Sequence, residues 1–325
     1  MNEIFSLAGS NLLSPIILSF ALGVSAALAR SDLAIPEAVA KGMSIYLLFA
    51  IGFKGGVAVS SHGVDTTLIL SLLAGLILSF ALPLLAFAIL RVMTGMNNTD
   101  AAAVAAHYGS ISIVTFVAGT SILEGRAIDS EGYLVAVAAV MEAPAILSAL
   151  WLIARGGGGK RMEPELMREI MLNGSIVLLV GAFVIGALTG EKGLTEIAPF
   201  IVTPFKGVLC LFLLDMGLIA GRGLRNIRGV IGPGAIAFAI IMPLISSAIG
   251  LGAGLLIGLS LGGIVLLMVL SASASYIAVP AAMRVALPEA NPAIYLTLSL
   301  GVTFPFNLTL GIPLYLAMAQ LAMGA

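Results

Sequence analysis

The chain has 325 residues, of which 10% are charged, and a mean hydropathy of +1.15. A soluble domain of this length needs many more surface charges, so the composition excludes a soluble globular protein and indicates an all-α polytopic membrane protein. The formal net charge of −1 argues against a nucleic-acid partner, and the one cysteine, Cys210, excludes an intrachain disulfide.

Ten apolar runs, separated by Gly, Pro, Asn or charged clusters, are long enough to cross a bilayer, which takes about 20 mostly apolar residues. The first run is interpreted as a retained helix, because Glu3 stands where a signal peptide would be basic. Spans eight and nine nearly merge at Gly258–Gly263. The predicted spans are 13–29, 35–53, 66–91, 100–123, 132–154, 171–189, 196–220, 229–257, 262–285 and 292–321.

Lys and Arg residues are distributed unevenly between the two sets of loops. Eleven follow the odd-numbered spans, and the other side has three, which predicts that the first set is cytoplasmic and both termini are outside a plasma (inner) membrane. The cytoplasmic set is Arg30, Lys41, Arg91, Arg155, Lys160, Arg161, Arg168, Arg222, Arg225, Arg228 and Arg284, and the other set is Lys54, Arg126 and Lys192.

The two halves of the chain, 1–160 and 161–325, resemble each other at a nearly constant offset. "FALG" (20–23) parallels "FVIG" (183–186), "IGFKGG" (51–56) parallels "MGLIAG" (216–221), and Ser112 parallels Ser275. Pro144 likewise parallels Pro305, and the Gly-rich segment 155–169 joins the halves. Five spans per half, an odd number, predict inverted repeats, a recurring design of secondary transporters whose site lies near the midplane.

"SASASYIAVP" (271–280) places serines at alternate positions inside span nine. Such serines cannot share one helix face, so either Ser273 points away from Ser271 and Ser275 or the segment is not regular helix. Pro280 favours the second interpretation, because it removes a helical hydrogen bond. Backbone groups freed at membrane depth must line a cavity or find protein partners, so we predict a broken helix that forms half of a polar binding site.

"HYGSISIVT" (107–115) in span four is predicted to supply the other half of the site. Gly109 weakens the helix, and Ser110, Ser112 and Thr115 contribute hydroxyls, of which the last two lie on one face. A single hydroxyl would be assigned to a bond with its own helix or a neighbouring one. Two clusters at equivalent positions of the repeats favour a binding site.

These stretches resemble the sodium-dependent bicarbonate transporter family first known from cyanobacteria. The similarity covers most of the chain and is most specific in "SASASYIAVPAAMRVALPEANPAIY" (271–295) and "GIPLYLAMAQ" (311–320). It implies sodium-coupled import of bicarbonate by ten helices in two inverted repeats, with broken helices four and nine. It further implies a homotrimer, a scaffold of spans 1, 2, 6 and 7, a mobile core of spans 3–5 and 8–10, and a cytoplasmic PII-type regulator.

By this resemblance Ser112, Thr115, Ser273 and Ser275 correspond to polar residues of the family's binding site. Val114 replaces a second serine, Tyr276 replaces an aspartate, and Ala278 and Val279 replace a Ser-Gly pair. We expect the substrate to contact Gly109, Ser110, Ser112, Thr115, Ser273, Ser275 and Tyr276.

Ionisable residues within the spans are functional candidates, because burying them is costly. Glu142 matches an acidic position of the family and is expected to bind a cation or stabilise the core, and Ser271 and Asn307 are expected to bind a cation. Lys206 and Asp215 lie too far apart on one helix to pair, so Asp215 is expected to pair with another helix.

Two other charged or titratable residues have ordinary explanations. Asp100 is consistent with helix-end electrostatics. His107 either bonds across helices in its neutral form or carries a proton.

The leading hypothesis is a secondary transporter that needs no cofactor beyond sodium as coupling ion. The first alternative is uptake of another small anion coupled to sodium or protons. A membrane-embedded hydrolase using His107 with Ser110 or Ser112 is the least favoured, since the sequence has no metal-ligand pairs or nucleophile-elbow pattern. A channel requires no internal repeat.

Overall fold

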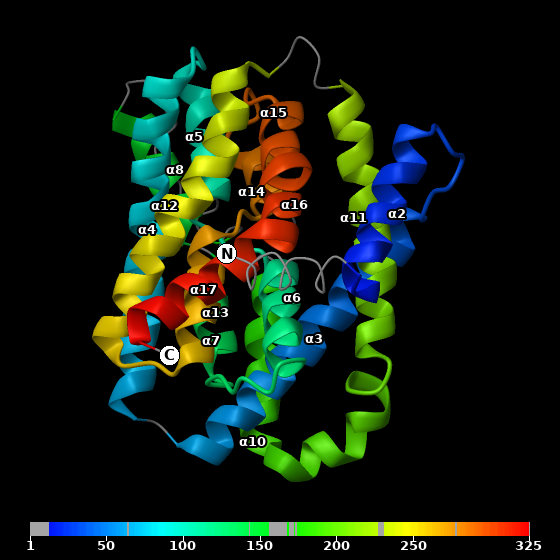
Figure 1. Cartoon of the computed structure of the whole chain (residues 1–325), viewed down its shortest axis with the longest axis vertical. Helices are drawn as coiled ribbons and strands as arrows, with labels where there is room; N and C mark the ends of the chain where they lie inside the picture. Colours follow the sequence, from blue (N-terminus) through cyan, green and yellow to red (C-terminus); the bar gives the residue numbers. More distant parts are fainter. Residues whose placement is uncertain are drawn as a thin grey trace.

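The computed structural model describes residues 13–63, 65–142, 144–155, 168, 172, 174–226, 231–276 and 278–324 (Figure 1). Within these ranges the regular structure is entirely helical. Seven of the helical segments are long and apolar enough to cross a membrane. The prediction of an all-α polytopic membrane protein is therefore confirmed at this level.

The helices follow one another along the chain with short connections. They are α2 (Pro15–Leu28), α3 (Glu37–His62), α4 (Thr66–Met93), α5 (Asn98–His107), α6 (Ile113–Glu124), α7 (Leu134–Val140), α8 (Pro144–Arg155), α10 (Gly174–Ile201), α11 (Phe205–Asn226), α12 (Pro233–Ile257), α13 (Leu261–Ala272), α14 (Ala278–Ala286) and α15 (Pro292–Leu296), followed by η1 (Thr297–Thr303), α16 (Phe304–Phe306), η2 (Asn307–Gly311) and α17 (Ile312–Met323).

One predicted boundary is wrong and another is confirmed. Helix α3 continues to His62, so Lys54 lies inside this helix, whereas the predicted span ended just before it. The predicted end of span six at residue 189 is confirmed: Gly190, with a φ of 59°, has a non-helical backbone, and a second helical segment follows it to Ile201. In α3 the helix extends beyond its apolar stretch, which polarity alone cannot reveal. Most of segment 155–169 lies outside the described residues.

The predicted boundary between spans eight and nine is confirmed. Helix α12 ends at Ile257, and Gly258 follows in the left-handed conformation, which favours glycine. The Ser260 side chain then accepts a hydrogen bond from the Gly263 amide and begins α13.

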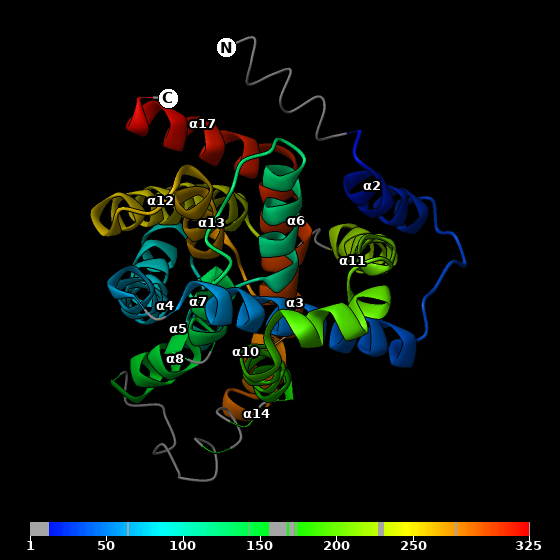
Figure 2. The same ribbon diagram turned by 90° about the horizontal axis from the view of Figure 1, so that it is seen from below.

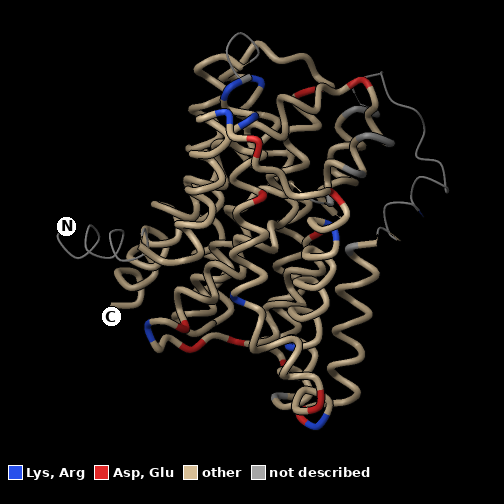
Figure 3. The backbone as a smooth tube through the Cα atoms, turned by 90° about the vertical axis from the view of Figure 1, so that its right-hand side faces the viewer, with Lys and Arg blue, Asp and Glu red and all other residues tan. Residues whose placement is uncertain are grey.

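Two helix pairs, α2 with α11 and α3 with α10, pack with their backbones in close contact. A Cβ atom on Gly23 would collide with the Leu214 carbonyl, and one on Gly217 with the Phe20 carbonyl. On the other pair, a Cβ atom on Gly56 would collide with the Phe183 carbonyl. Figure 2 shows α2 and α11 side by side, away from α4, α8 and α12. Charged residues gather toward the two ends of the molecule (Figure 3).

The helices of predicted spans four, five and nine are interrupted. Helices α6 and α14 each begin six positions after α5 and α13 end. Helix α7 ends at Val140 and α8 begins at Pro144, a residue suited to the first position of a helix but not to its interior. Predicted span ten stays helical from Pro292 to Met323, with two π-helical stretches, a feature often found near functional sites.

Candidate functional site

The breaks in spans four and nine cross and hydrogen-bond to each other. The Ser112 amide donates to Ser273 Oγ at 2.9 Å, and the Ser275 amide donates to the His107 carbonyl at 2.8 Å. Both Ser112 and Ser273 have extended backbones. The crossing therefore supplies partners for amides and carbonyls that the interrupted helices leave free.

Ser112 is the N-cap of α6, and Ser275 lies three residues before α14 begins. Ser112 Oγ accepts a hydrogen bond from the Thr115 amide at 3.2 Å and one from the Thr115 hydroxyl at 2.9 Å. Ser275 Oγ accepts a long hydrogen bond, 3.5 Å, from the Val279 amide. Each oxygen acts as an acceptor in these bonds, so both serine hydroxyls keep a proton to donate to a bound ligand.

These two hydroxyls face a small buried cavity of about 10 Å³, room for roughly one water molecule. The cavity is lined by Leu48, Ile111, Ser112, Ile113, Glu142, Ser275 and Tyr276. Helix α6 begins beside it, and the positive end of that helix dipole favours a bound anion. A larger solute requires the surrounding helices to separate.

Glu142 brings a carboxylate to this cavity from the third break, between α7 and α8. The Ser79 hydroxyl donates to the Met141 carbonyl at 2.6 Å and stabilises the end of α7. Glu142 itself is 4% exposed, and its Oε2 atom has no hydrogen-bond partner among the described residues. A buried carboxylate without a partner requires a cation or a proton. Pro144 was the sequence signal for this break.

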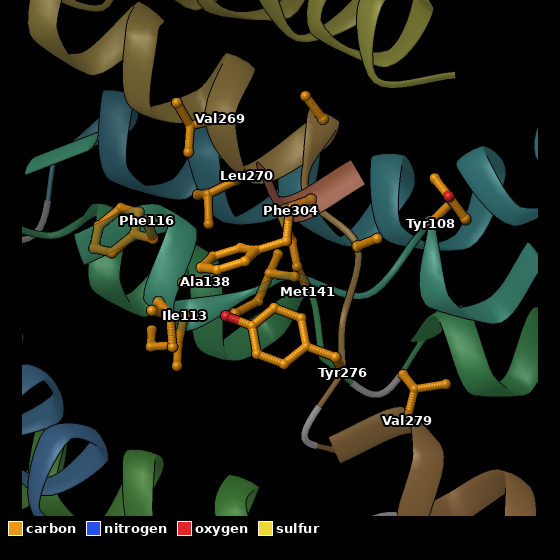
Figure 4. Close-up of a cluster of buried hydrophobic side chains, with 14 of the residues drawn as sticks. Tyr108, Ile113, Phe116, Ala138, Met141, Val269, Leu270, Tyr276, Val279 and Phe304 are labelled. Carbon is orange, nitrogen blue, oxygen red and sulfur yellow. The ribbon is translucent and has the colours of Figure 1, made fainter. Parts of the chain in front are cut away.

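By the family resemblance, Tyr276 occupies a position at which an aspartate is expected. This chain therefore has a neutral phenol there. Its ring packs edge-to-face on Phe304, with the centroids 5.1 Å apart. Figure 4 shows the hydroxyl directed toward Ile113, away from Val279. The hydroxyl is buried close to the Ser112 side chain, without a hydrogen bond of ordinary length within the described part of the chain, and it faces the cavity where a ligand can meet it.

The remaining substrate candidates have different surroundings. Gly109 packs against α4, where a Cβ atom would collide with the ring of Pro83. Ser110 is buried with a hydroxyl that has no partner among the described residues. Ser273 donates to the Leu270 carbonyl at 2.9 Å while accepting from the Ser112 amide, so it joins the two breaks.

The two other candidate cation ligands already have protein partners. The Ser271 hydroxyl donates to the Leu267 carbonyl at 2.8 Å, a bond within its own helix. Asn307, at the start of η2, donates from Nδ2 to the Ala272 carbonyl at 2.9 Å and accepts from the Tyr315 hydroxyl at 2.7 Å. Neither residue lines the small cavity. In this conformation both bind protein groups, and Asn307 ties α13 to the last helix.

His107 is fully buried and lies at the end of α5. Its Nδ1 atom lies 2.6 Å from the Ala103 carbonyl and its ring stacks on Tyr295, with the centroids 4.6 Å apart. A carbonyl oxygen only accepts, so Nδ1 carries the proton in this bond. Nε2 has no partner among the described residues, and so makes no hydrogen bond to Ser110 or Ser112. The pairing that a serine nucleophile requires is not formed.

The other charged residues lie away from the cavity. Asp100 is in the first turn of α5, as helix-end electrostatics predicts, and accepts from the Asn291 amide at 2.7 Å. Lys206 lies in the first turn of α11, and its Nζ atom is 3.9 Å from Glu124 Oε2. Asp215 is buried in the middle of α11.

A helical membrane protein whose broken helices cross beside hydroxyl donors and a buried carboxylate has the features of a membrane transport protein. The sequence agrees with this class. Residues 15–320 match the Na⁺-dependent bicarbonate transporter superfamily, and the chain belongs to that family, which is one of transporters and not of enzymes. The comparison with curated proteins found no match.

Proposed function

We propose that the protein imports bicarbonate together with sodium by alternating access, as a multi-pass protein of the plasma (inner) membrane with both termini outside. The observation that carries the proposal is the pairing of two serine hydroxyl donors, Ser112 and Ser275, with the unpartnered Glu142 carboxylate around one cavity. Such a site offers separate binding groups to an anion and to a cation.

In this proposal the anion binds between the two crossed breaks. The Ser112 and Ser275 hydroxyls donate to bicarbonate oxygens, and the N-terminal end of α6 adds a favourable dipole. Sodium prefers oxygen ligands, and the Glu142 carboxylate supplies a charged one beside the anion. Each ion then offsets the desolvation cost of the other, which couples their binding.

Alternating access requires two sets of helices that move relative to each other. The proposed scaffold is spans 1, 2, 6 and 7, which are α2, α3, α10 and α11. The proposed inverted repeat relates α2 to α10 and α3 to α11, so it relates the packed pair α2–α11 to the packed pair α3–α10. The proposal is also supported by the spacing of one pair of helix starts: the capping residues Asn97 and Ser260, which precede α5 and α13, are separated by the same 163 positions as Ser112 and Ser275. A trimer and a PII-type regulator are proposed from the family resemblance.

Uptake of radiolabelled bicarbonate into proteoliposomes at alkaline pH tests the function, because passive CO₂ entry is then suppressed. We expect an inward sodium gradient to stimulate uptake, and Ser112→Ala and Ser275→Ala each to abolish most of it. Ser271→Ala is the matched control, since its hydroxyl bonds only within its own helix. Uptake that is insensitive to both Ser112 and Ser275 would refute the site.

A second candidate is uptake of bicarbonate or another small anion coupled to protons. The observation that favours it is that Tyr276 lines the cavity together with Glu142. Because a phenol is neutral, Glu142 is the one carboxylate in the cavity lining, and it could bind a proton in place of sodium. Uptake driven by an inward proton gradient without sodium, and lost in Glu142→Gln, would establish this alternative.

A further inference from the structure

A second and larger cavity opens next to the small one. Its volume is about 710 Å³, and residues of α3, α6, α7, the 127–132 segment and the start of α11 line it. We call it the vestibule. The α6–α7 connection with Arg126 borders it, so the loop charges predict that the vestibule is on the outer side.

The vestibule continues the path to the small cavity along two helices. On α3, Leu48 lines the small cavity and Ile51 and Lys54 line the vestibule, each about one turn further along the same face. On α6, Ile113 lines the small cavity and Phe116 the vestibule. A solute entering from this side passes Lys54 before it reaches the serines.

Lys54 is half-buried in the vestibule wall. Its amino group lies 4.8 Å from the centre of the Phe205 ring. This cation–π contact stabilises the ammonium group, and the ring carries no negative charge to neutralise it. No carboxylate among the described residues lies within ion-pair distance of it, and the acidic side chain that acts on its charge is Glu124 of the same vestibule. The other vestibule cation, Lys206, pairs with Glu124 at 3.9 Å. Asp129 also lines the vestibule, with its carbonyl oxygen 3.5 Å from Ser260 Oγ.

The corresponding position of the second half has no charge. Aligning "IGFKGG" (51–56) with "MGLIAG" (216–221) pairs Lys54 with Ile219. Ile219 lines a cavity of about 220 Å³ between α11 and η1, where the charged lining residue Arg222 donates to the Leu33 carbonyl at 3.1 Å. A cation without an ion pair among the described residues is therefore a feature of the vestibule and not of the repeat.

We propose that Lys54 forms a first binding site for the transported anion, a small oxyanion, in the vestibule. Identifying that anion as bicarbonate rests on the proposed function. The Lys54 charge raises the local concentration of anions above the crossed breaks, so it acts on the capture of substrate and not on the transport step.

Transport kinetics supply the first test. We expect Lys54→Met to raise the KM for bicarbonate uptake by roughly five- to tenfold with Vmax changed by less than about twofold, and Lys54→Arg to restore the normal KM. Lys192→Met is the matched control, because Lys192 is an exposed cation of α10 that does not line the vestibule. A lower Vmax at unchanged KM would overturn the proposal.

Chemical protection supplies a test that needs no transport. Reductive methylation of the purified protein, read by mass spectrometry, reports the reactivity of Lys54, with Lys192 as internal reference. We expect bicarbonate to slow methylation of Lys54, and the protection to persist in the Ser112→Ala/Ser275→Ala double variant. Unchanged reactivity of Lys54 in bicarbonate and in nitrate would overturn the vestibule site.

The two tests separate failure of the site from failure of the proposed function. If the protein imports no bicarbonate but nitrate protects Lys54, the vestibule site stands and bicarbonate is the wrong anion. If bicarbonate is imported but neither KM nor Lys54 reactivity responds, the proposed function stands and the vestibule site is refuted.

Discussion

The glycine-packed helix pairs and the crossed breaks bring backbones together in opposite ways. In α2–α11 and α3–α10 the backbone is helical at the closest contacts, and glycines allow one backbone to touch the next. At the breaks the backbone is extended, and two cross-hydrogen bonds, from the Ser112 and Ser275 amides, replace helical ones.

The difference teaches how one apolar chain combines a rigid part with a changeable one. A continuous helix satisfies its backbone internally, so the glycine contact depends on shape alone. The crossing depends on a few directional bonds, and a ligand can compete for the hydroxyls beside them. We expect substitutions in the pairs to affect folding and substitutions at the crossing to affect transport.

The largest effect is expected from Gly217→Val in α11. The added side chain would collide with the Phe20 carbonyl, a backbone atom that cannot move aside. Overpacking costs about 1–3 kcal/mol, and more against backbone, so we expect a Tm lowered by about 10 °C or no folded protein. Gly207→Ala in the same helix, where nothing lies within 4 Å, is the control and should keep its Tm. Equal Tm values for both variants would disprove the close packing.

Glu142→Gln should separate coupling from folding. The change removes a buried charge without a partner, so the Tm in sodium-free buffer should not fall. The sodium concentration for half-maximal uptake should rise by about tenfold or more, since a charge-assisted contact contributes roughly 1.5–3 kcal/mol. Measuring uptake against sodium concentration, with Glu196→Gln as the control at an exposed glutamate that lines neither cavity, checks this. An unchanged sodium dependence would remove Glu142 from the cation site.

Ser273→Ala and Ser271→Ala compare two serines of the same segment. Loss of the Ser273 hydroxyl leaves the buried Ser112 amide without its acceptor, which costs about 1–3 kcal/mol. Loss of the Ser271 hydroxyl removes a bond within one helix, which contributes little. Thermal unfolding in detergent should show a lower Tm for the first variant alone. If the two Tm values agree, the cross-hydrogen bond does not hold the breaks together.

Tyr276→Phe should have the smallest effect. The phenol oxygen makes no hydrogen bond of ordinary length among the described residues, so its removal should leave the Tm unchanged or slightly raised. If the hydroxyl meets the substrate, the KM for bicarbonate rises by about threefold, as loss of one weak neutral hydrogen bond predicts. A lowered Tm with normal KM would instead assign the hydroxyl a structural role.

Part of the site could be predicted because the residues that break helices are visible in the sequence. Serine clusters with Gly109 or Pro280 indicated where spans four and nine are interrupted, whereas the break before Pro144 falls inside span five, which was predicted as one span over 132–154. The roles of Ser271 and Ser275 could not be separated in this way. They lie one helical turn apart in sequence, and only the end of α13 at Ala272 directs one hydroxyl to its own helix and the other to the cavity.

The sequence by itself determined the membrane class, the family and the breaks in spans four and nine, because hydropathy, helix-breaking residues and motifs act locally along the chain. The tertiary structure alone decided that Glu142 joins Ser112 and Ser275, and that Lys54 lies in a vestibule wall and not at a helix end. Those relations join residues far apart in the chain. They depend on how the helices cross and on where a helix continues past its apolar stretch. Short-range sequence patterns predict neither of these features.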